Sequence, residues 1–316
     1  MRFGVTLGTL LNYDDIPKCA KIADKYADLI LIPESWGRDA FVTLGVLSNI
    51  TNNSMLGSGI VSIYSRTSAS IAMAAATLDA YSNKRAFIGL GASSKSIVEN
   101  WHGLEFKDNV TRMREYVESI RLILNNKKVN YDGKIVKIRN FKLGFKPVRD
   151  KIPIYIAAIK AKMLNLALEI GDGLIIFLYP IDEIPNVLSK INRDNFEVLH
   201  VIITSIADDE DKAIERASKT IAFYTAVGDI YAEFLREHGY KEEVDSIREE
   251  YARNGFTNIH KYVSKNMLDS LAIYGNKDQC NKMFKRFASM NITPVLHLNP
   301  VYDAEQSMKD LLEAIV

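Results

Sequence analysis

The chain has 316 residues, of which 47% are hydrophobic and 25% charged, and 40 basic residues against 39 acidic ones leave a formal net charge of +1. This composition is typical of a soluble globular protein and excludes a disordered chain, a collagen and a disulfide scaffold. A charge so near zero argues against nucleic acid or an anionic membrane as the main partner. No run of 18 or more apolar residues occurs, so no membrane-spanning segment is expected.

Eight short apolar segments recur along the chain, and most are apolar at consecutive positions. Continuous apolarity predicts parallel strands that are buried on both faces. The predicted strands are 2–7, 29–33, 55–62, 86–91, 153–158, 173–178, 197–206 and 294–298.

Longer, mostly amphipathic stretches separate these segments and predict helices. Acidic residues open the stretches that begin at 14 and 208, and Ser68 is expected to cap the one that begins there. The predicted helices are 14–25, 68–81, 109–124, 161–170, 208–220, 277–288 and 304–314.

Eight strands separated by helices predict an α/β fold, a closed (β/α)8 TIM barrel, in a single domain over residues 1–316. A doubly wound open sheet is the competing architecture, but its GxGxxG fingerprint is absent after the first strand.

Two segments depart from the alternation. Residues 129–145 predict a hairpin with its turn at 131–134. Residues 221–267 predict a helical insertion between strands seven and eight, which we expect to shape the substrate pocket.

The cysteines and histidines show no metal-binding pattern. Cys19 and Cys280 lie far apart without a CxxC motif, and the five histidines contain no HxxxH pair. We therefore expect no metal site and no disulfide framework. This cysteine usage and the lack of a signal peptide at the N-terminus indicate a cytoplasmic protein.

Candidate reactive residues are sought where strands end, because barrel enzymes place their sites there. After strand two, Glu34 and Asp39 are expected to line a cavity and Trp36 to pack against a flat ligand. The alternative is a solvated turn in which Arg38 pairs with Asp39. His102 is a possible general base, although a structural role is favoured.

Glycines near the ends of strands three and four permit close approach of the backbone to a ligand or to another strand. Gly57 and Gly59 follow this pattern in strand three. Gly89 and Gly91, followed by two serines and a helix, form a possible phosphate-binding turn, with close packing as the alternative. Residues 157–162 form a second possible anion site before a helix.

Several of these segments, taken together, carry a family resemblance. The specific part is "GSGIVSIYSRTSASIAMAAATLDAYSNKRAFIGLGAS" at 57–93, with supporting segments "PESWGRDAF" at 33–41, "WHGLEF" at 101–106 and "PIYIAAIKAKMLNLALEIGDGLI" at 153–175. They resemble the luciferase-like superfamily of flavin and deazaflavin enzymes. The nearest branch depends on coenzyme F420 and includes methylenetetrahydromethanopterin reductase. The resemblance implies a TIM barrel, a homodimer or higher even oligomer, and a small-molecule substrate.

The resemblance also implies site residues. Glu34 and Ser35 match positions that face the deazaflavin and the substrate, and Glu34 is the catalytic acid/base candidate. Gly59–Ile60 matches a non-prolyl cis peptide bond that backs the cofactor. The substrate pocket is expected to include Thr6, Trp36 and Asp39. The other implied cofactor-binding positions are Val61, Gly89, Leu90, Gly91, Ala157, Ala158, Ile159, Ile175 and Ile176.

Two positions depart from the named activities of the branch. Thr6 stands where methanopterin reductase has a Glu, and Ser35 stands where the sugar-phosphate and alcohol dehydrogenases have a His. The sequence therefore predicts an F420-dependent oxidoreductase that transfers a hydride between the deazaflavin and an unassigned small organic substrate. The alternatives are an FMN-dependent luciferase-like monooxygenase and a non-catalytic flavin-binding protein.

Overall fold

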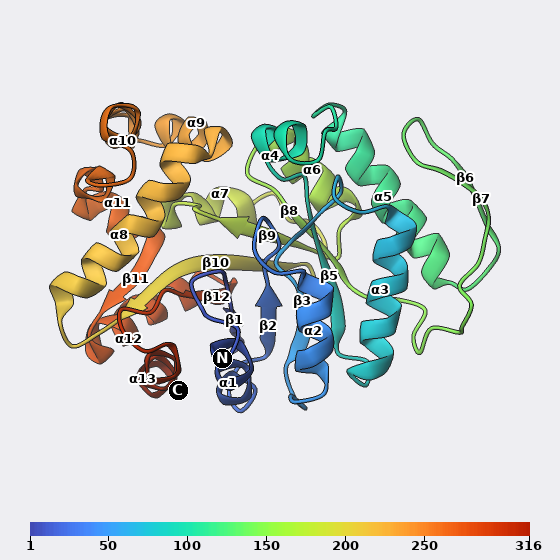
Figure 1. Cartoon of the computed structure of the whole chain (residues 1–316), viewed down its shortest axis with the longest axis horizontal. Helices are drawn as coiled ribbons and strands as arrows, with labels where there is room; N and C mark the ends of the chain where they lie inside the picture. Colours follow the sequence, from blue (N-terminus) through green and yellow to red (C-terminus); the bar gives the residue numbers. More distant parts are fainter. The chain divides into compact units, whose positions relative to one another are not determined.

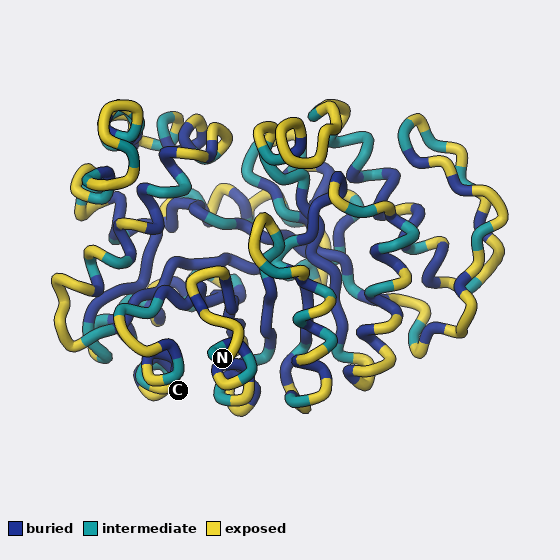
Figure 2. The backbone as a smooth tube through the Cα atoms, viewed as in Figure 1, coloured by how far each residue is buried: buried dark blue, intermediate teal, exposed yellow.

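The computed structural model describes residues 1–316 and divides into two compact units. We call residues 28–175 the central unit, and residues 1–27 with 176–316 the terminal unit. Figure 1 labels the elements of both, and Figure 2 shows which parts of each are buried. The expected single domain over 1–316 stays a prediction.

The central unit contains a sheet of parallel strands. β2 (Leu29–Ile32), β3 (Met55–Ser58), β5 (Ala86–Gly91), β8 (Ile154–Ala157) and the start of β9 (Gly173–Phe177) pair in that order, and β4 (Val61–Ser62) pairs with β5. Its helices are α2 (Ala40–Ser48), α3 (Ser68–Tyr81), α4 (Lys95–Asn100), α5 (Asn109–Leu124) and α6 (Ala161–Ile170). Every residue of β2 and of β5 is buried, as continuous apolarity predicted.

The terminal unit has its own parallel strands. β1 (Gly4–Thr6), β12 (Thr293–Leu298), β10 (Glu197–Ile206) and β11 (Ala272–Gly275) pair in that order. Its helices are α1 (Asp15–Ala23), η1 (Ile181–Glu183), α7 (Ile184–Leu188), α8 (Glu210–Val227), α9 (Asp229–Glu237), α10 (Lys241–Asn254), η2 (Ile259–Tyr262), α11 (Lys265–Leu271), α12 (Lys277–Ala288) and α13 (Ala304–Ile315). No helix in either unit is long and apolar enough to cross a bilayer.

All eight predicted strands are present, and the helices α3, α5, α6 and α12 have the predicted bounds. Five elements were not predicted: α2, α4, η1, α7 and β11. The sequence of α2, AFVTLGVLS, contains no charged residue and therefore has no polar face to reveal a helical period. The predicted cap of α3 was wrong by one residue, because Thr67, not Ser68, accepts the N–H of Ser70.

The hairpin is confirmed as β6 (Val129–Asp132) and β7 (Lys137–Phe141), which pair antiparallel. Its turn lies at 133–136, since Tyr131 and Asp132 belong to β6. The buried carboxylate of Glu115 on α5 accepts the backbone N–H groups of residues 134–136 at 2.7–2.8 Å. This contact fixes the turn to the central unit.

The segment predicted as an insertion, 221–267, is helical within the terminal unit and runs from the end of α8 into α11. Its role in shaping a pocket stays a prediction.

A buried ion pair joins α3 to the chain that leads into β8. Arg149 donates from Nε to both carboxylate oxygens of Asp79, at 2.9 and 3.1 Å, and from Nη2 at 2.6 Å. Asp79 is fully buried and also accepts the N–H of Ala86 at 3.1 Å. Breaking such a pair leaves a desolvated charge without its partner.

Replacing Asp79 by Ala should lower the free energy of unfolding by about 3 kcal/mol, the low end for a broken buried pair because Arg149 stays partly exposed. Urea denaturation followed by circular dichroism measures this loss. Glu249→Ala, which breaks the exposed Arg253–Glu249 pair of α10, is the control and should cost less than about 0.5 kcal/mol. Equal effects of the two substitutions would contradict the structural role of Asp79.

Candidate functional site

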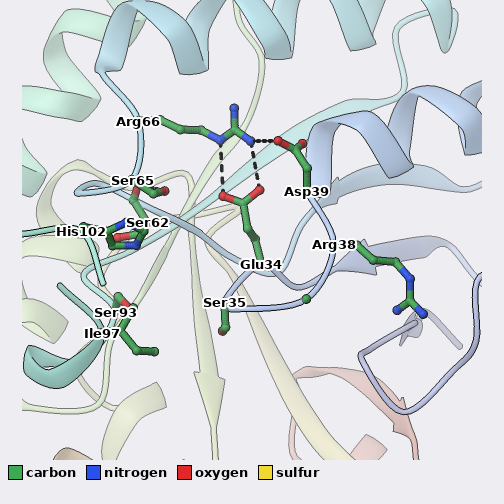
Figure 3. Close-up of a pocket in the computed structure, with 11 residues that line it drawn as sticks. Glu34, Ser35, Arg38, Asp39, Ser62, Ser65, Arg66, Ser93, Ile97 and His102 are labelled. Atoms are coloured by element: carbon green, nitrogen blue, oxygen red, sulfur yellow. Dashed lines mark hydrogen bonds and ion pairs between the residues drawn. The ribbon is translucent and has the colours of Figure 1, made fainter. Parts of the chain in front are cut away.

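The central unit contains a cavity of about 360 Å³ that is lined mainly by polar side chains (Figure 3). Its walls come from the segments that follow β2, β4 and β5 and from α4 and the turn after it. These segments meet because the carboxyl ends of parallel strands lie along one edge of a sheet. The lining residues are Glu34, Ser35, Gly37, Arg38, Asp39, Ser62, Ser65, Arg66, Ser93, Ile97 and His102.

An ion-pair network of one cation and two carboxylates forms one wall of the cavity. Arg66 donates to Glu34 from Nε to Oε1 at 3.3 Å and from Nη2 to Oε2 at 3.1 Å. The same Nη2 is paired with Asp39 (Figure 3). The backbone N–H of Ala40 donates to Glu34 Oε2 at 2.8 Å. Both oxygens of Glu34 are therefore engaged, and Arg66 is held between two negative charges.

Asp39 has a second function at the start of α2. Its side chain accepts the N–H of Val42 at 2.9 Å and so caps the helix. Burial alone would raise the pKa of Asp39, but the Val42 N–H and the Arg66 guanidinium outweigh burial and hold the pKa below its ordinary value. The pairing of Asp39 with Arg38, the alternative from sequence, is replaced by the pairing with Arg66.

Two aromatic candidates lie differently from expectation. Trp36 is half exposed and packs edge-on against Trp101, with ring centroids 5.9 Å apart, and it is not among the lining residues. His102, for which a structural role was favoured, lines the cavity (Figure 3). His102 thus belongs to the candidate site.

The glycines near the ends of β3 and β5 bring two backbones together. The Gly59–Ile60 peptide bond is cis, as the resemblance implied. A Cβ on Gly89 would lie only 2.1 Å from the carbonyl oxygen of Ser58. The Ser58 hydroxyl donates to Gly89 O at 2.9 Å and accepts the Gly89 N–H at 3.0 Å. Packing between β3 and β5 accounts for the glycine at position 89.

The remaining predicted positions do not line the cavity. Val61, Leu90, Gly91, Ala157, Ala158, Ile159 and Ile175 lie on or next to β4, β5, β8 and β9 of the central unit. Thr6, at the end of β1, and Ile176, in β9, belong to the terminal unit. Their contacts with a ligand stay predictions. No group of three or more His, Cys, Asp or Glu side chains is arranged to hold a metal ion.

Sequence reasoning assigned no site role to Ser62, Ser65 or Ile97, left Arg66 between helix capping and ligand contact, and included Ser93 only as a serine of the possible phosphate-binding turn; all five line the cavity. The signal that could have found Ser62, Ser65 and Arg66 is their position at the end of the glycine-containing strand at 55–62 and directly after it. The pairing of Arg66 with Glu34 joins residues 32 positions apart, which no local pattern reveals.

Replacing Arg66 by Gln should raise the pKa of Asp39, because the positive charge that favours its ionised form is removed. In the wild-type protein the depressed pKa stabilises the fold above the unfolded value of about 3.9, and this contribution is lost as the pH falls through the folded pKa. Carboxyl-carbon NMR titration measures the pKa of Asp39, and urea denaturation at a series of pH values measures the stability. Asp209, whose pKa is lowered by the N–H and the ammonium group of Lys212, is the internal control and should not move. An unchanged Asp39 would refute the electrostatic coupling.

The chain matches known proteins along nearly its whole length. A family profile described as "Luciferase-like monooxygenase" matches residues 1–293. The 5,10-methylenetetrahydromethanopterin reductase of Archaeoglobus fulgidus is 32% identical over 317 residues, covering 95% of this chain and 94% of that protein. The protein of the same name from Methanolobus tindarius is 28% identical, with 95% of each chain covered.

A solved structure shows the same architecture. The coenzyme F420-dependent tetrahydromethanopterin reductase of Methanopyrus kandleri matches with a TM-score of 0.87 and 25% identity, covering 99% of this chain and 98% of that chain. The fold is therefore the α/β (β/α)8 TIM barrel that the sequence predicted, and not the doubly wound open sheet.

Proposed function

Because the chain belongs to the luciferase-like monooxygenase family, we propose that it is a coenzyme F420-dependent oxidoreductase that transfers a hydride between the deazaflavin and a small organic substrate. The proposal is supported by relatives over nearly the full chain that are named methylenetetrahydromethanopterin reductases, one of them in a structure described as F420-dependent. The FMN-dependent monooxygenase and the non-catalytic flavin-binding protein receive no such support. The substrate is left open, because Thr6 and Ser35 depart from the named activities.

The polar groups of the cavity suit this cofactor. F420 carries hydroxyl groups, a phosphate and an acidic tail, so its site needs hydroxyl donors and positive charge. The cavity supplies the hydroxyls of Ser35, Ser62, Ser65 and Ser93 and the guanidinium group of Arg38, whereas that of Arg66 is already paired with Glu34 and Asp39. Its volume of about 360 Å³ is large enough for part of such a ligand.

When bound, F420 supplies two-electron chemistry by exchanging a hydride at a ring carbon. The residues of this chain then have to orient the reactants and exclude water. The Arg66 network holds the segment after β2 against the segment after β4, since Glu34 and Asp39 come from the first and Arg66 from the second. This cross-link fixes the wall from which the serine hydroxyls face the cavity.

Glu34 is the proposed acid/base residue. Its carboxylate lines the cavity with 15% of its side chain exposed, so a substrate atom can approach it. Both of its oxygens are engaged by Arg66 and the N–H of Ala40, which fixes the position of the carboxylate at the cavity wall. Glu34 would therefore accept or stabilise a proton while Arg66 holds its position.

Replacing Glu34 by Gln should lower kcat by at least about a hundredfold and leave the Kd for F420 nearly unchanged, because proton transfer is lost while size is kept. Steady-state kinetics and fluorescence titration measure the two quantities. Asp39→Asn is the control, because it also removes a carboxylate that pairs with Arg66. If Glu34 and Asp39 only hold Arg66 in place, the two substitutions should lower kcat by similar amounts. If kcat survives Glu34→Gln, Glu34 is not the acid/base residue.

The activity itself is tested by spectroscopy of the deazaflavin. With a panel of small hydride donors and acceptors, at least one member should change the redox state of F420 in a protein-dependent manner. Oxygen uptake with reduced FMN and an aldehyde is the comparison. Uptake there, with no turnover of F420, would reverse the assignment in favour of the monooxygenase.

We propose a homodimer formed through α2 and α3. Four large apolar side chains on these helices are exposed: Val42 and Val46 on α2, at 69% and 54%, and Met73 and Tyr81 on α3, at 48% and 75%. The only charged residue in either helix is Asp79, which is fully buried. A second copy of this surface is its natural partner, because two uncharged faces need no opposite charge and a C2 axis makes them self-complementary.

Replacing Val46 by Glu should convert the dimer to monomers, because a carboxylate would be buried without a partner in an apolar interface. Light scattering after size-exclusion chromatography gives the mass directly. Val148→Glu, at an exposed valine outside α2 and α3, is the matched control and should leave the mass unchanged. A wild-type monomer, or a dimer that survives Val46→Glu, would exclude this interface.

A cytoplasmic location is also proposed. Cys19 and Cys280 are buried and free. Burial is the main cause that raises the pKa of each thiol to about 12, so neither thiolate forms at neutral pH. Two unpaired, unreactive thiols suit a reducing compartment.

A further inference from the structure

Polar side chains gather at the carboxyl ends of β1 and β12 in the terminal unit. Thr6 and His297 are partners in register on these neighbouring parallel strands, so their side chains point to the same side. Thr6 is 1% exposed and His297 7% exposed. The Thr6 hydroxyl has no hydrogen-bond partner, which is unfavourable for a buried group. The imidazole of His297 stacks on Phe177, with ring centroids 6.0 Å apart.

The helix α8, which carries an unpaired cation, is bonded to the end of β12 beside this pair: the Thr220 hydroxyl donates to Asn299 Oδ1 at 2.6 Å, and Asn299 Nδ2 donates to His297 O at 2.6 Å. Arg216 projects from α8, and its buried Nε has no hydrogen-bond partner. The lysines at 212 and 219 on the same helix are paired with Asp209 and Glu215, whereas Arg216 forms no ion pair. Burial lowers the pKa of Arg216 from its ordinary value, as expected for a guanidinium that no carboxylate stabilises.

Arg216 and His297 influence one another electrostatically. Burial is the main cause that lowers the pKa of His297 to about 4, and the positive charge of Arg216 is the second. The imidazole is therefore neutral at pH 7 and offers one N–H donor. Together with the Thr6 hydroxyl and the Arg216 guanidinium, the group offers donors and a net charge of +1, without an acceptor of opposite charge.

We propose that Arg216, His297 and Thr6 form a binding site for a carboxylate group of a ligand. One carboxylate would neutralise the single positive charge, and its two oxygens can accept bonds from the guanidinium, the imidazole and the hydroxyl together. The site rests on the proposed function for the source of that carboxylate, which is either the acidic tail of F420 or the substrate itself. If the carboxylate belongs to the substrate, the substrate is an organic acid.

Acetate is the probe that tests the site without any catalytic assay. In the wild-type protein, acetate should raise the pKa of His297, because a bound anion favours the imidazolium. Ring-proton NMR measures this, with His297→Gln identifying the signal. Arg216→Gln should itself raise the pKa of His297, because the nearby cation is gone, and should weaken acetate binding by about tenfold or more.

Two further variants keep the test decisive. Arg216→Lys retains the charge and should keep a weaker acetate response, which separates loss of charge from loss of packing. Lys219→Gln removes a positive charge from the exposed, paired side of the same helix and should respond to acetate as the wild type does. If acetate leaves His297 unaffected in the wild type, or shifts it equally in Arg216→Gln, the site does not exist.

Titration of F420 into the same variants identifies the source. A Kd raised tenfold or more in Arg216→Gln assigns the site to the acidic tail of the cofactor. An unchanged Kd for F420, together with a lost acetate response, assigns the site to the substrate. Either of these two results supports the existence of the carboxylate site. An acetate response in a protein that binds no F420 would support the carboxylate site and contradict the proposed function.

Discussion

Because the central strands are buried on both faces, the polar side chains that can contact a ligand lie at the ends of these strands. The position of the candidate site depends on this constraint. β2 and β5 are buried at every position, so the polar side chains on which a site depends lie in the segments beyond Ile32 and Gly91. β3 and β5 approach so closely that Gly89 has no room for a Cβ beside Ser58. The cavity forms where this packing stops, because the chain leaves the sheet there and its side chains can face a ligand.

Charge in the cavity is balanced by the protein itself. Arg66 is paired with Glu34 and Asp39. Glu34 also accepts the backbone N–H of Ala40 at the start of α2, and Asp39 caps that helix by accepting the N–H of Val42. The network orders the loop after β2 and supplies a rigid wall, as a hydride-transfer site needs. Arg216 in the terminal unit is the opposite case, since its charge has no partner within the chain. This contrast suggests different tasks: positioning for Arg66 and ligand recognition for Arg216.

Much of the fold was predictable because it follows from local periodicity. All eight barrel strands were found from runs of consecutive apolar residues, and α3 and α5 were placed to the residue. α2 was missed because a helix without a polar face has no period to detect. The same lack of charge makes α2 a candidate interface. The feature that hid this helix from sequence analysis is therefore the feature on which the proposed dimer rests.

The site was predictable in part. Glu34 and Asp39 were found from their position after a strand and Ser35 from the family resemblance, and all three line the cavity. Arg66 was left between helix capping and ligand contact, and a structural role was favoured for His102. The pairing of Arg66 with Glu34 spans 32 positions, and the place of His102 in the cavity is visible only in the folded chain. Trp36 packs edge-on against Trp101, a neighbour 65 positions away that no local pattern indicates, and its expected contact with a ligand stays a prediction.

The central claim is that this barrel uses a deazaflavin. Calorimetric titration of the purified protein with F420 and, separately, with FMN tests it most directly. The account predicts that F420 binds and that FMN binds much more weakly, because FMN lacks the acidic tail. Tighter binding of FMN would contradict it and move the protein to the monooxygenase branch. Binding of neither would show that the chain shares the fold of its relatives without their cofactor.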